Sequence, residues 1–211
     1  LHAPSQIVSS LKSRAAEQGA SVLISMVEHV QQCQAAVQEL LAQRVEALLV
    51  NVPQDDPDAE QLQKMALPVP VLFLDVSPSA QVNSLVFNAG QGAALGAEHL
   101  ISLGHQRIAL LSGPESSVSA RARLAGWKTA LVQAGLEAAD EVHGDWSAAS
   151  GYEKGHQLLS GSQLPDAILV ANDQMALGVM RACVEKGIAI PGQISIVGFD
   201  DTADSAWFSP P

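Results

Sequence analysis

The 211-residue sequence is poor in positive charge, with 11 lysine and arginine residues against 22 aspartate and glutamate residues and a formal net charge of −11. A surface this acidic repels phosphate backbones, and no cluster of lysine and arginine offsets the repulsion. We therefore expect that these residues do not bind nucleic acid by themselves.

Cysteine is equally scarce. The only two, Cys33 and Cys183, are far apart in the sequence, and each lies in an apolar pattern typical of a helix. We expect two buried free thiols and no disulfide, which favours a reducing compartment and hence the cytoplasm. Two cysteines make a cysteine-based zinc site very unfavourable, and the six histidines show no metal-ligand spacing, so no metal is expected.

Long apolar runs are also absent, and none approaches the roughly 20 residues of a membrane span. No signal peptide is visible, although the chain begins at Leu1 without a methionine and we expect it to be a fragment. Hydrophobic residues make up 47% of the chain and charged residues 16%, which indicates a folded, soluble protein that does not enter the membrane.

What the sequence does contain is an alternation of short apolar strands with amphipathic helices. Such alternation is typical of an α/β fold with parallel sheets and right-handed crossovers. The expected strands are Ser21–Met26, Ala47–Val50, Val69–Leu74, Ser84–Phe87, Arg107–Leu111, Glu141–Gly144, Ala167–Ala171 and Ile194–Phe199.

Turn-forming residues at 76–83 interrupt this rhythm, so we place a lobe boundary near residue 87. The simplest interpretation is two similar parallel-sheet lobes, residues 1–87 and residues 88–211, with a ligand cleft between them. No repeat is visible at the level of sequence.

A glycine motif after one strand deserves comparison with a dinucleotide fingerprint. Gly90, Gly92 and Gly96 precede and open a helix, but their spacing is wrong by one residue and no acidic residue follows about 20 positions on. Glycines that allow close helix packing explain the motif better, and we expect no cofactor. No catalytic set is present either: Gly-x-Ser-x-Gly does not occur, and the loop 113–119 lacks a phosphate-binding lysine.

Several polar or aromatic residues instead lie near the carboxyl ends of expected strands, where ligands of open α/β folds bind. Carboxylates, amides and a guanidinium hydrogen-bond to hydroxyl groups, and an indole covers the apolar face of a sugar ring. A purely structural role also explains some single residues: Asp75 can solvate a turn, Asp173 can cap a helix, and Trp127 is expected in the core. The candidates are Asp75, Ser117, Ser119, Arg123, Trp146, Asn172 and Asp200.

Long strings of the sequence resemble the lactose/galactose repressor family of bacterial transcription regulators. They include Leu103–Gly113 (LGHQRIALLSG), Ala120–Trp127 (ARARLAGW) and the segment 170–201. The segments Leu1–Ile7, Phe73–Val76 and Gly144–Ala148 carry the same resemblance, which covers essentially the whole chain with a small gap near His29–Gln31.

The resemblance implies a fold like that of the type I periplasmic binding proteins, in which a sugar inducer lies between two lobes. It assigns inducer contacts to Ala3, Pro4, Ile7, Leu74, Asp75 and Phe87 in the first lobe. In the second lobe it assigns them to Ser117, Ser119, Arg123, Trp146, Asn172 and Asp200.

The resemblance also implies a homodimer, or a tetramer in the full-length protein, although no tetramerising leucine heptads are seen. Its dimer interface would include His2, Lys12, Asp204 and Phe208. The family's helix-turn-helix head should lie upstream of Leu1, so operator DNA would be bound only through that missing head. The segment that returns to the first lobe should follow Pro211, which leaves both lobes incomplete.

The leading hypothesis is therefore the sugar-sensing core of a repressor that binds a galactoside-like inducer and thereby lowers the operator affinity of the head. A periplasmic sugar-binding protein of a transport system is the alternative, and a signal peptide upstream of Leu1 would favour it. A sugar-processing enzyme is the third hypothesis, and it lacks an acid–base pair in the sequence.

Overall fold

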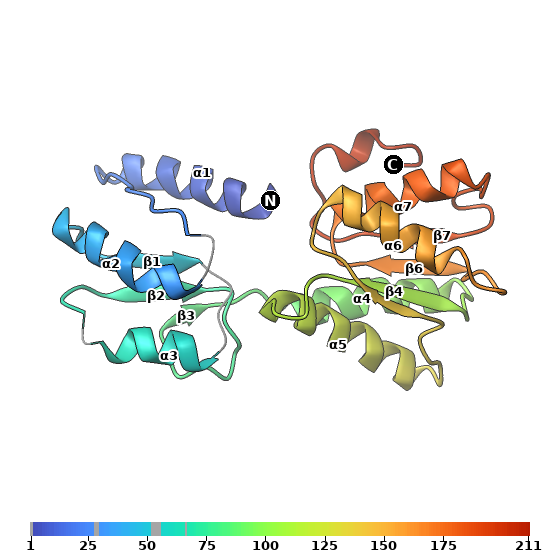
Figure 1. Ribbon diagram of the computed structural model, residues 1–211, viewed down its shortest axis with the longest axis horizontal. Helices are drawn as coiled ribbons and strands as arrows, with labels where there is room; N and C mark the ends of the chain where they lie inside the picture. The colour runs from blue at the N-terminus through green and yellow to red at the C-terminus, as the bar shows by residue number, and fades with distance from the viewer. Residues whose placement is uncertain (1, 28–29, 52–55, 66) are drawn as a thin grey trace. The chain divides into compact units, whose positions relative to one another are not determined.

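The computed structural model describes residues 2–27, 30–51, 56–65 and 67–211. The chain divides into two compact units, Leu1–Phe87 (unit 1) and Asn88–Pro211 (unit 2). Both units are α/β, with parallel sheets, as the alternation of strands and helices predicts (Figure 1).

Unit 1 is built around a parallel sheet of order β1-β2-β3. Its elements are α1 (His2–Glu17), η1 (Val30–Gln32), α2 (Cys33–Ala42), β1 (Leu48–Asn51), α3 (Asp56–Lys64), β2 (Val71–Leu74) and β3 (Ser84–Leu85). Residues from α2 and α3, among them Val37 and Leu62, pack on the face of the sheet that carries Val50 and Phe73. α1 ends two residues before Gly19, whose φ of 71° suits only glycine well.

The strand expected at Ser21–Met26 is wrong. These residues form no regular structure, and Leu23 and Ile24 are 46% and 44% exposed. The segment is apolar enough for a strand, but a strand needs a hydrogen-bonding neighbour, and the described sheet of unit 1 contains only β1, β2 and β3. Local pattern alone therefore does not place it in the sheet.

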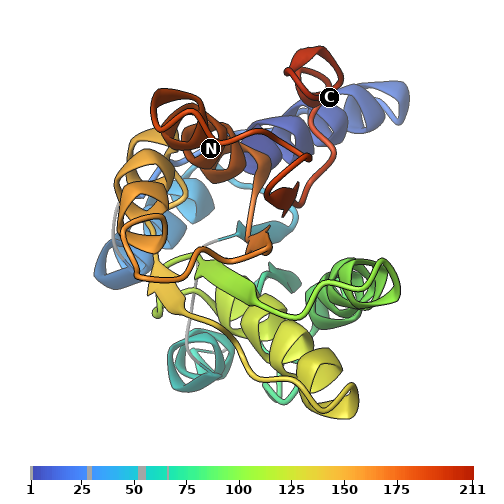
Figure 2. The ribbon, with the colours of Figure 1, turned by 90° about the vertical axis from the view of Figure 1, so that its right-hand side faces the viewer.

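Unit 2 has a four-stranded parallel sheet of order β5-β4-β6-β7. Its elements are α4 (Ala89–Ser102), β4 (Ile108–Ser112), α5 (Val118–Gln133), β5 (Glu141–His143), α6 (Ala148–Leu158), β6 (Ala167–Val170), α7 (Asp173–Glu185), β7 (Ser195–Val197) and η2 (Ser205–Trp207). Figures 1 and 2 show α4 and α5 on one face of this sheet and α6 and α7 on the other.

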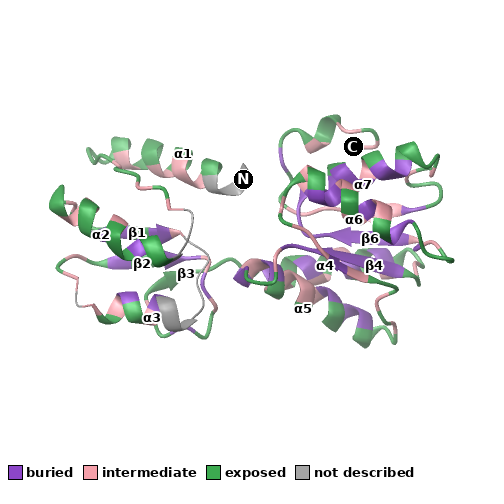
Figure 3. Cartoon of the chain, in the orientation of Figure 1, coloured by how far each residue is buried: buried purple, intermediate pink, exposed green. Residues whose placement is uncertain are grey.

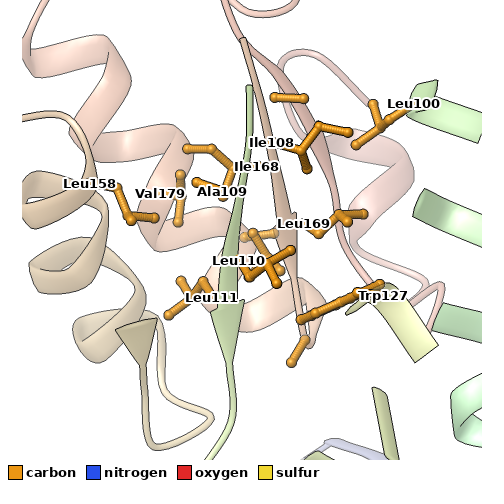
Figure 4. Packing of buried hydrophobic residues seen from close by; sticks show 14 of the residues in the cluster. Leu100, Ile108, Ala109, Leu110, Leu111, Trp127, Leu158, Ile168, Leu169 and Val179 are labelled. Carbon is orange, nitrogen blue, oxygen red and sulfur yellow. The ribbon is translucent and has the colours of Figure 1, made fainter. Parts of the chain in front are cut away.

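The core of unit 2 lies on both faces of its two central strands. Every residue of β4 and β6 is buried (Figure 3). Leu110, Leu169 and Trp127 are at most 1% exposed, and Figure 4 shows them packed with residues from the flanking helices. Trp127 is a core residue, as expected. Cys33 and Cys183 are free and buried, which also confirms the expectation from sequence.

The glycines at the start of α4 allow close packing. A Cβ at Gly92 would lie 3.2 Å from the ring of Phe199, and one at Gly96 would lie 3.3 Å from Val197 Cγ1. Gly90 faces Ala122 O of α5, 3.1 Å from its would-be Cβ. The packing interpretation of this motif is confirmed.

Candidate ligand-binding site

The carboxyl ends of the strands in unit 2 meet at one edge of the sheet. The parallel register pairs Leu111 with both Val142 and Val170, and Leu169 with Val197. The loops that follow all four strands therefore leave the sheet on the same side. Four candidate residues, Arg123, Trp146, Asn172 and Asp200, are connected to one another there.

Arg123 on α5 is the centre of this group. Its Nη1 donates a hydrogen bond to the carbonyl oxygen of Ala171, and its Nη2 lies 3.5 Å from Asp200 Oδ1. The Arg123 side chain is 13% exposed and that of Asp200 is 21% exposed. A largely buried charge needs such a partner, because desolvation would otherwise make its ionised form costly.

Trp146 follows β5 and has a φ of 75°, in the left-handed region. The turn around it is fixed by polar contacts, since Asp145 Oδ1 accepts a hydrogen bond of 2.9 Å from Ser147 N and Ser150 Oγ accepts one of 3.0 Å from Asp145 N. Hydrogen bonds from Ser147, through its side chain and its backbone, and from Ser150 lower the pKa of Asp145. The carboxylate thus stays charged and holds the turn.

The indole of Trp146 packs directly on Gly113, the residue after β4. A Cβ at Gly113 would lie 2.5 Å from Trp146 Cη2, closer than real Cβ contacts come. Only glycine leaves room there. The ring also lies 5.4 Å from the guanidinium carbon of Arg123, within cation–π range.

Asn172 is the N-cap of α7. Its Oδ1 accepts a hydrogen bond of 2.9 Å from Met175 N, and its Nδ2 donates one of 3.0 Å to the carbonyl oxygen of Trp146. The interpretation of Asp173 as the cap is wrong, because its Oδ2 instead accepts a hydrogen bond of 2.8 Å from Thr202 N. Asn172 is the N-cap because its backbone is extended directly before the first helical residue.

Trp146, Asp200 and Asp201, which follow strands of unit 2, have positive φ angles. Asp75 follows β2 of unit 1, and Arg44 follows α2. Among the described residues, the non-glycine positive φ values are 60° at Arg44, 56° at Asp75, 75° at Trp146, 106° at Asp200 and 51° at Asp201. Three of these five residues were candidates from sequence. Strained residues cluster at binding sites because the surrounding structure must hold them there for a purpose.

Ser117 and Ser119 begin the helix that carries Arg123. Ser117 is the N-cap of α5, its Oγ accepts a hydrogen bond of 3.3 Å from Ala120 N, and the two serine hydroxyls lie 3.3 Å apart. Ser119 and Arg123 are four residues apart and share one face of the helix.

In unit 1 the candidates lie on separate elements. Leu74 is buried at the end of β2, and Asp75 follows it in a bend. Ile7 is half-buried on α1, and Phe87 is 74% exposed beyond β3. Ala3 and Pro4 belong to α1, but their side chains lie outside the described residues.

The residues expected at the dimer interface are dispersed. Lys12 and Asp204 are exposed, and Phe208 is half-buried. His2 is in α1, and its side chain lies outside the described residues.

A cavity of about 530 Å³ adjoins this polar group in unit 2. Its walls come from α7, β7 and the chain end, and include Met180, Ile190 and Phe208. It shares Phe199 and Asp200 with the polar group, but Arg123, Trp146 and Asn172 do not line it. The polar group and this mainly apolar cavity are therefore distinct features.

Within the described residues, no group of three or more histidine, cysteine, aspartate or glutamate side chains could hold a metal ion. None of the described helices combines the length and the apolar character that a membrane span requires.

The fold and the site define the class of protein. The family model of the periplasmic binding protein-like domain matches residues 97–211, more than half of the chain. Parallel α/β units with polar residues at the carboxyl ends of their strands are what such a ligand-binding domain requires.

Individual relatives narrow the class. The chain is 54% identical to the lactose operon repressor of Escherichia coli K12 over 100% of its own length and 59% of that protein. For the lactose operon repressor of Klebsiella pneumoniae the values are 43%, 100% and 60%. The chain thus spans about three-fifths of the length of these curated relatives.

Solved structures agree. A dimeric Lac repressor with a C-terminal deletion has a TM-score of 0.96 and 53% identity, with 100% of this chain and 79% of that chain covered. A Lac repressor bound to ONPG has a TM-score of 0.96 and 54% identity, with 100% and 65% covered. The chain belongs to the lactose/galactose repressor family.

Two residues that contact Arg123 or Trp146 in the candidate site were not among the candidates from sequence. Phe199 was assigned only to a strand, yet its ring lies 3.8 Å from the guanidinium carbon of Arg123. Gly113 was seen only as part of a loop. Their positions in the sequence could have indicated both residues. Phe199 directly precedes the candidate Asp200, and Gly113 directly follows β4.

Proposed function

We propose that this chain is the sugar-sensing regulatory core of a lactose-repressor-like transcriptional repressor. In this proposal a galactoside-like inducer binds to the core and lowers the affinity of a helix-turn-helix head, outside this chain, for operator DNA. The core senses the sugar and does not transform it.

The single observation that carries the proposal is the connected group of Arg123, Asp200 and Trp146. A planar donor fork and a carboxylate 3.5 Å apart present donors and acceptors suited to neighbouring hydroxyl groups. An indole beside them supplies an apolar surface for the face of a sugar ring. The 54% identity to the lactose operon repressor of Escherichia coli supports a galactoside as the sugar.

The proposed inducer contacts follow the residues named from sequence. In unit 2 they are Ser117, Ser119, Arg123, Trp146, Asn172 and Asp200; in unit 1 they are Ala3, Pro4, Ile7, Leu74, Asp75 and Phe87. We assign residues 1–87 and 88–211 to the N-terminal and C-terminal lobes of the core.

We also propose that the protein forms a dimer and acts in the cytoplasm. Two copies would form a dimer through His2, Lys12, Asp204 and Phe208, and the solved dimeric Lac repressor supports this. A protein that acts on operator DNA works in the cytoplasm, which agrees with two buried free thiols.

Calorimetry with a simple alkyl galactoside tests the binding site in the full-length protein. We expect Arg123→Ala and Asp200→Asn each to weaken binding by at least about 100-fold, because each removes a charged group that the proposal places against the sugar hydroxyls and breaks the Arg123–Asp200 ion pair. Asparagine tolerates the φ of 106° at position 200. Unchanged affinity in both variants would refute the site.

Neighbouring residues provide matched controls. Arg121 lies on the same helix, is exposed, and donates a hydrogen bond of 2.8 Å to the Glu115 carbonyl. Asp201 is exposed and also has a positive φ, of 51°. We expect Arg121→Ala and Asp201→Asn to bind the galactoside within about twofold of the unmodified protein, since surface changes of this kind are usually worth less than about 0.5 kcal/mol.

Fluorescence anisotropy with a labelled operator tests the coupling. A saturating galactoside should weaken operator binding at least about tenfold, which corresponds to about 1.4 kcal/mol of differential affinity between the two states. Galactoside binding without any change in operator affinity would show a sugar-binding protein that is not a repressor core.

A further inference from the structure

The guanidinium of Arg123 lies close to two aromatic rings. Its Cζ is 3.8 Å from the centroid of Phe199 and 5.4 Å from that of Trp146. In its own plane it donates to the Ala171 carbonyl and faces Asp200. Two aromatic rings, a carbonyl oxygen and a carboxylate therefore restrict the orientation of the group.

Phe199 is itself held from behind by α4. A Cβ at Gly92 would lie 3.2 Å from both Cε2 and Cζ of the Phe199 ring. The Phe199 ring thus packs against both the helix backbone at Gly92 and the guanidinium of Arg123. Gly92, which belongs to the motif that resembles a dinucleotide fingerprint, therefore has a packing role beneath the candidate site.

We propose that Phe199 is a positioning residue for sugar binding, which acts by fixing the guanidinium of Arg123 before the ligand arrives. Arginine loses much rotamer freedom when it is immobilised, and a side chain ordered in advance avoids that loss on binding. An aromatic ring at this distance also attracts the cation directly. The inference rests on the proposed function, since it names what holds the ligand-binding side chain.

The geometry also determines how a ligand meets Arg123. Phe199 and Trp146 already lie within cation–π distance of the guanidinium, so its N–H groups are the part that a hydroxyl oxygen can contact. In-plane approach gives the strongest hydrogen bonds to arginine.

Substitutions of Phe199 test the inference by calorimetry with the same alkyl galactoside. We expect Phe199→Leu, which keeps an apolar side chain but removes the ring, to weaken binding by about tenfold, on the scale of a partly desolvated cation–π contact. Phe199→Tyr keeps the ring and should bind within about twofold of the unmodified protein. Equal affinity in Phe199→Leu and the unmodified protein would overturn the inference.

A pair of glycine variants separates positioning from general packing. Gly92→Ala pushes the Phe199 ring, whereas Gly96→Ala, one turn later on α4, meets Val197 at a similarly tight 3.3 Å. Both should lower the melting temperature to a comparable degree, but only Gly92→Ala should weaken galactoside binding, by about threefold or more. If Gly96→Ala weakens binding as much as Gly92→Ala, Phe199 has only a structural role.

Nuclear magnetic resonance of the ligand-free protein provides a readout that does not depend on the sugar. Ring currents from Phe199 should shift the Arg123 guanidinium signals, and restricted rotation should keep its Nη protons distinct. In Phe199→Leu we expect these signals to move toward ordinary arginine values and to average. Unchanged signals would overturn the inference. Absence of galactoside binding in the unmodified protein, with the expected signal changes intact, would instead refute the proposed function.

Discussion

The two units begin from similar strands but bury them very differently. In unit 2 all residues of β4 and β6 are buried, so both faces of the sheet are covered (Figure 3). In unit 1 burial is interrupted in β1 and β2: Leu49 and Leu72, which are paired in register, are 41% and 37% exposed. Strands of similar apolar composition are thus fully buried in unit 2 and only partly buried in unit 1.

The difference teaches what an apolar strand pattern reports. Parallel strands need cover on both faces. In unit 2 the pairs α4–α5 and α6–α7 supply it (Figure 2). In unit 1, α2 and α3 cover one face, and none of the described side chains of α1, residues 5–17, is buried. The pattern indicates a requirement for burial, which unit 1 meets at Val50 and Phe73 but not at Leu49 and Leu72 among the residues that the structure describes.

Cutting one leucine in each unit gives the largest expected contrast. Leu169→Ala removes a fully buried side chain from unit 2 and should lower its free energy of unfolding by about 3 kcal/mol. Leu72→Ala removes a partly exposed one from unit 1 and should cost less than about 1 kcal/mol. Urea unfolding measures both effects in the 211-residue chain.

Each unit carries its own probe for this experiment. Trp127, Trp146 and Trp207 all belong to unit 2, so tryptophan fluorescence follows that unit alone. The alkylation rate of Cys33, which is buried in α2, follows the opening of unit 1. If Leu72→Ala costs as much as Leu169→Ala, the contrast between the units does not hold and the open face of unit 1 is covered in solution.

The buried thiol of unit 2 gives the next largest effect. Burial raises the pKa of Cys183 to about 11, from an ordinary value of 9.0. The unfolded thiol therefore loses its proton first, so the free energy of unfolding of unit 2 should fall as pH rises from 9.0 to about 11. The thiol's share of this fall should be at most about 2 kcal/mol.

A difference between variants isolates that contribution from other groups that titrate at alkaline pH. Cys183→Ala should lower stability at neutral pH and lose less than the unmodified chain between pH 9 and 11. Cys33→Ala, which removes the thiol of unit 1, should leave the pH profile of tryptophan fluorescence unfolding unchanged. Parallel profiles for Cys183→Ala and the unmodified chain would contradict the assignment.

Much of the fold follows from the sequence, because its strands and helices carry their own periodicity. Seven of the eight expected strands exist, and Gly19 and Gly104, typical helix-stop residues, lie just beyond helices with φ of 71° and 89°. Ser21–Met26 failed because a strand is defined by its neighbour. That neighbour is a tertiary fact, which no local pattern contains.

The site was predictable to a similar extent and for a similar reason. The strand-end rule brings together Arg123, Trp146, Asn172 and Asp200, since parallel strands share one carboxyl edge. It could not distinguish Asn172 from Asp173 as the cap of α7, because both residue types favour that position. Nor could it show that Phe199 lies under Arg123, since that contact depends on how closely α4 approaches β7.

The smallest contrast concerns one bridging carboxylate in each unit. Asp166 accepts hydrogen bonds of 3.1 and 3.0 Å from the backbone N–H groups of Gln106 and Arg107, which ties the start of β4 to that of β6. Glu60 in unit 1 accepts a longer one, of 3.3 Å, from Gln81 N. Asp166→Asn should cost unit 2 about 1 kcal/mol, and Glu60→Gln should cost unit 1 at most a few tenths of that.

The acid side of the pH profile provides the independent check on Asp166. Burial alone would raise its pKa, but the N–H groups of Gln106 and Arg107 and the charges of His105 and Arg107 lower it below 3.8. A lowered pKa stabilises the folded state above the unfolded value, and this contribution disappears as pH falls through the lower folded value. Unit 2 should therefore lose stability below about pH 4 by an amount that Asp166→Asn abolishes. An unchanged acid limb in Asp166→Asn would show that this carboxylate carries no measurable share of the stability of unit 2, which contradicts the expected contrast.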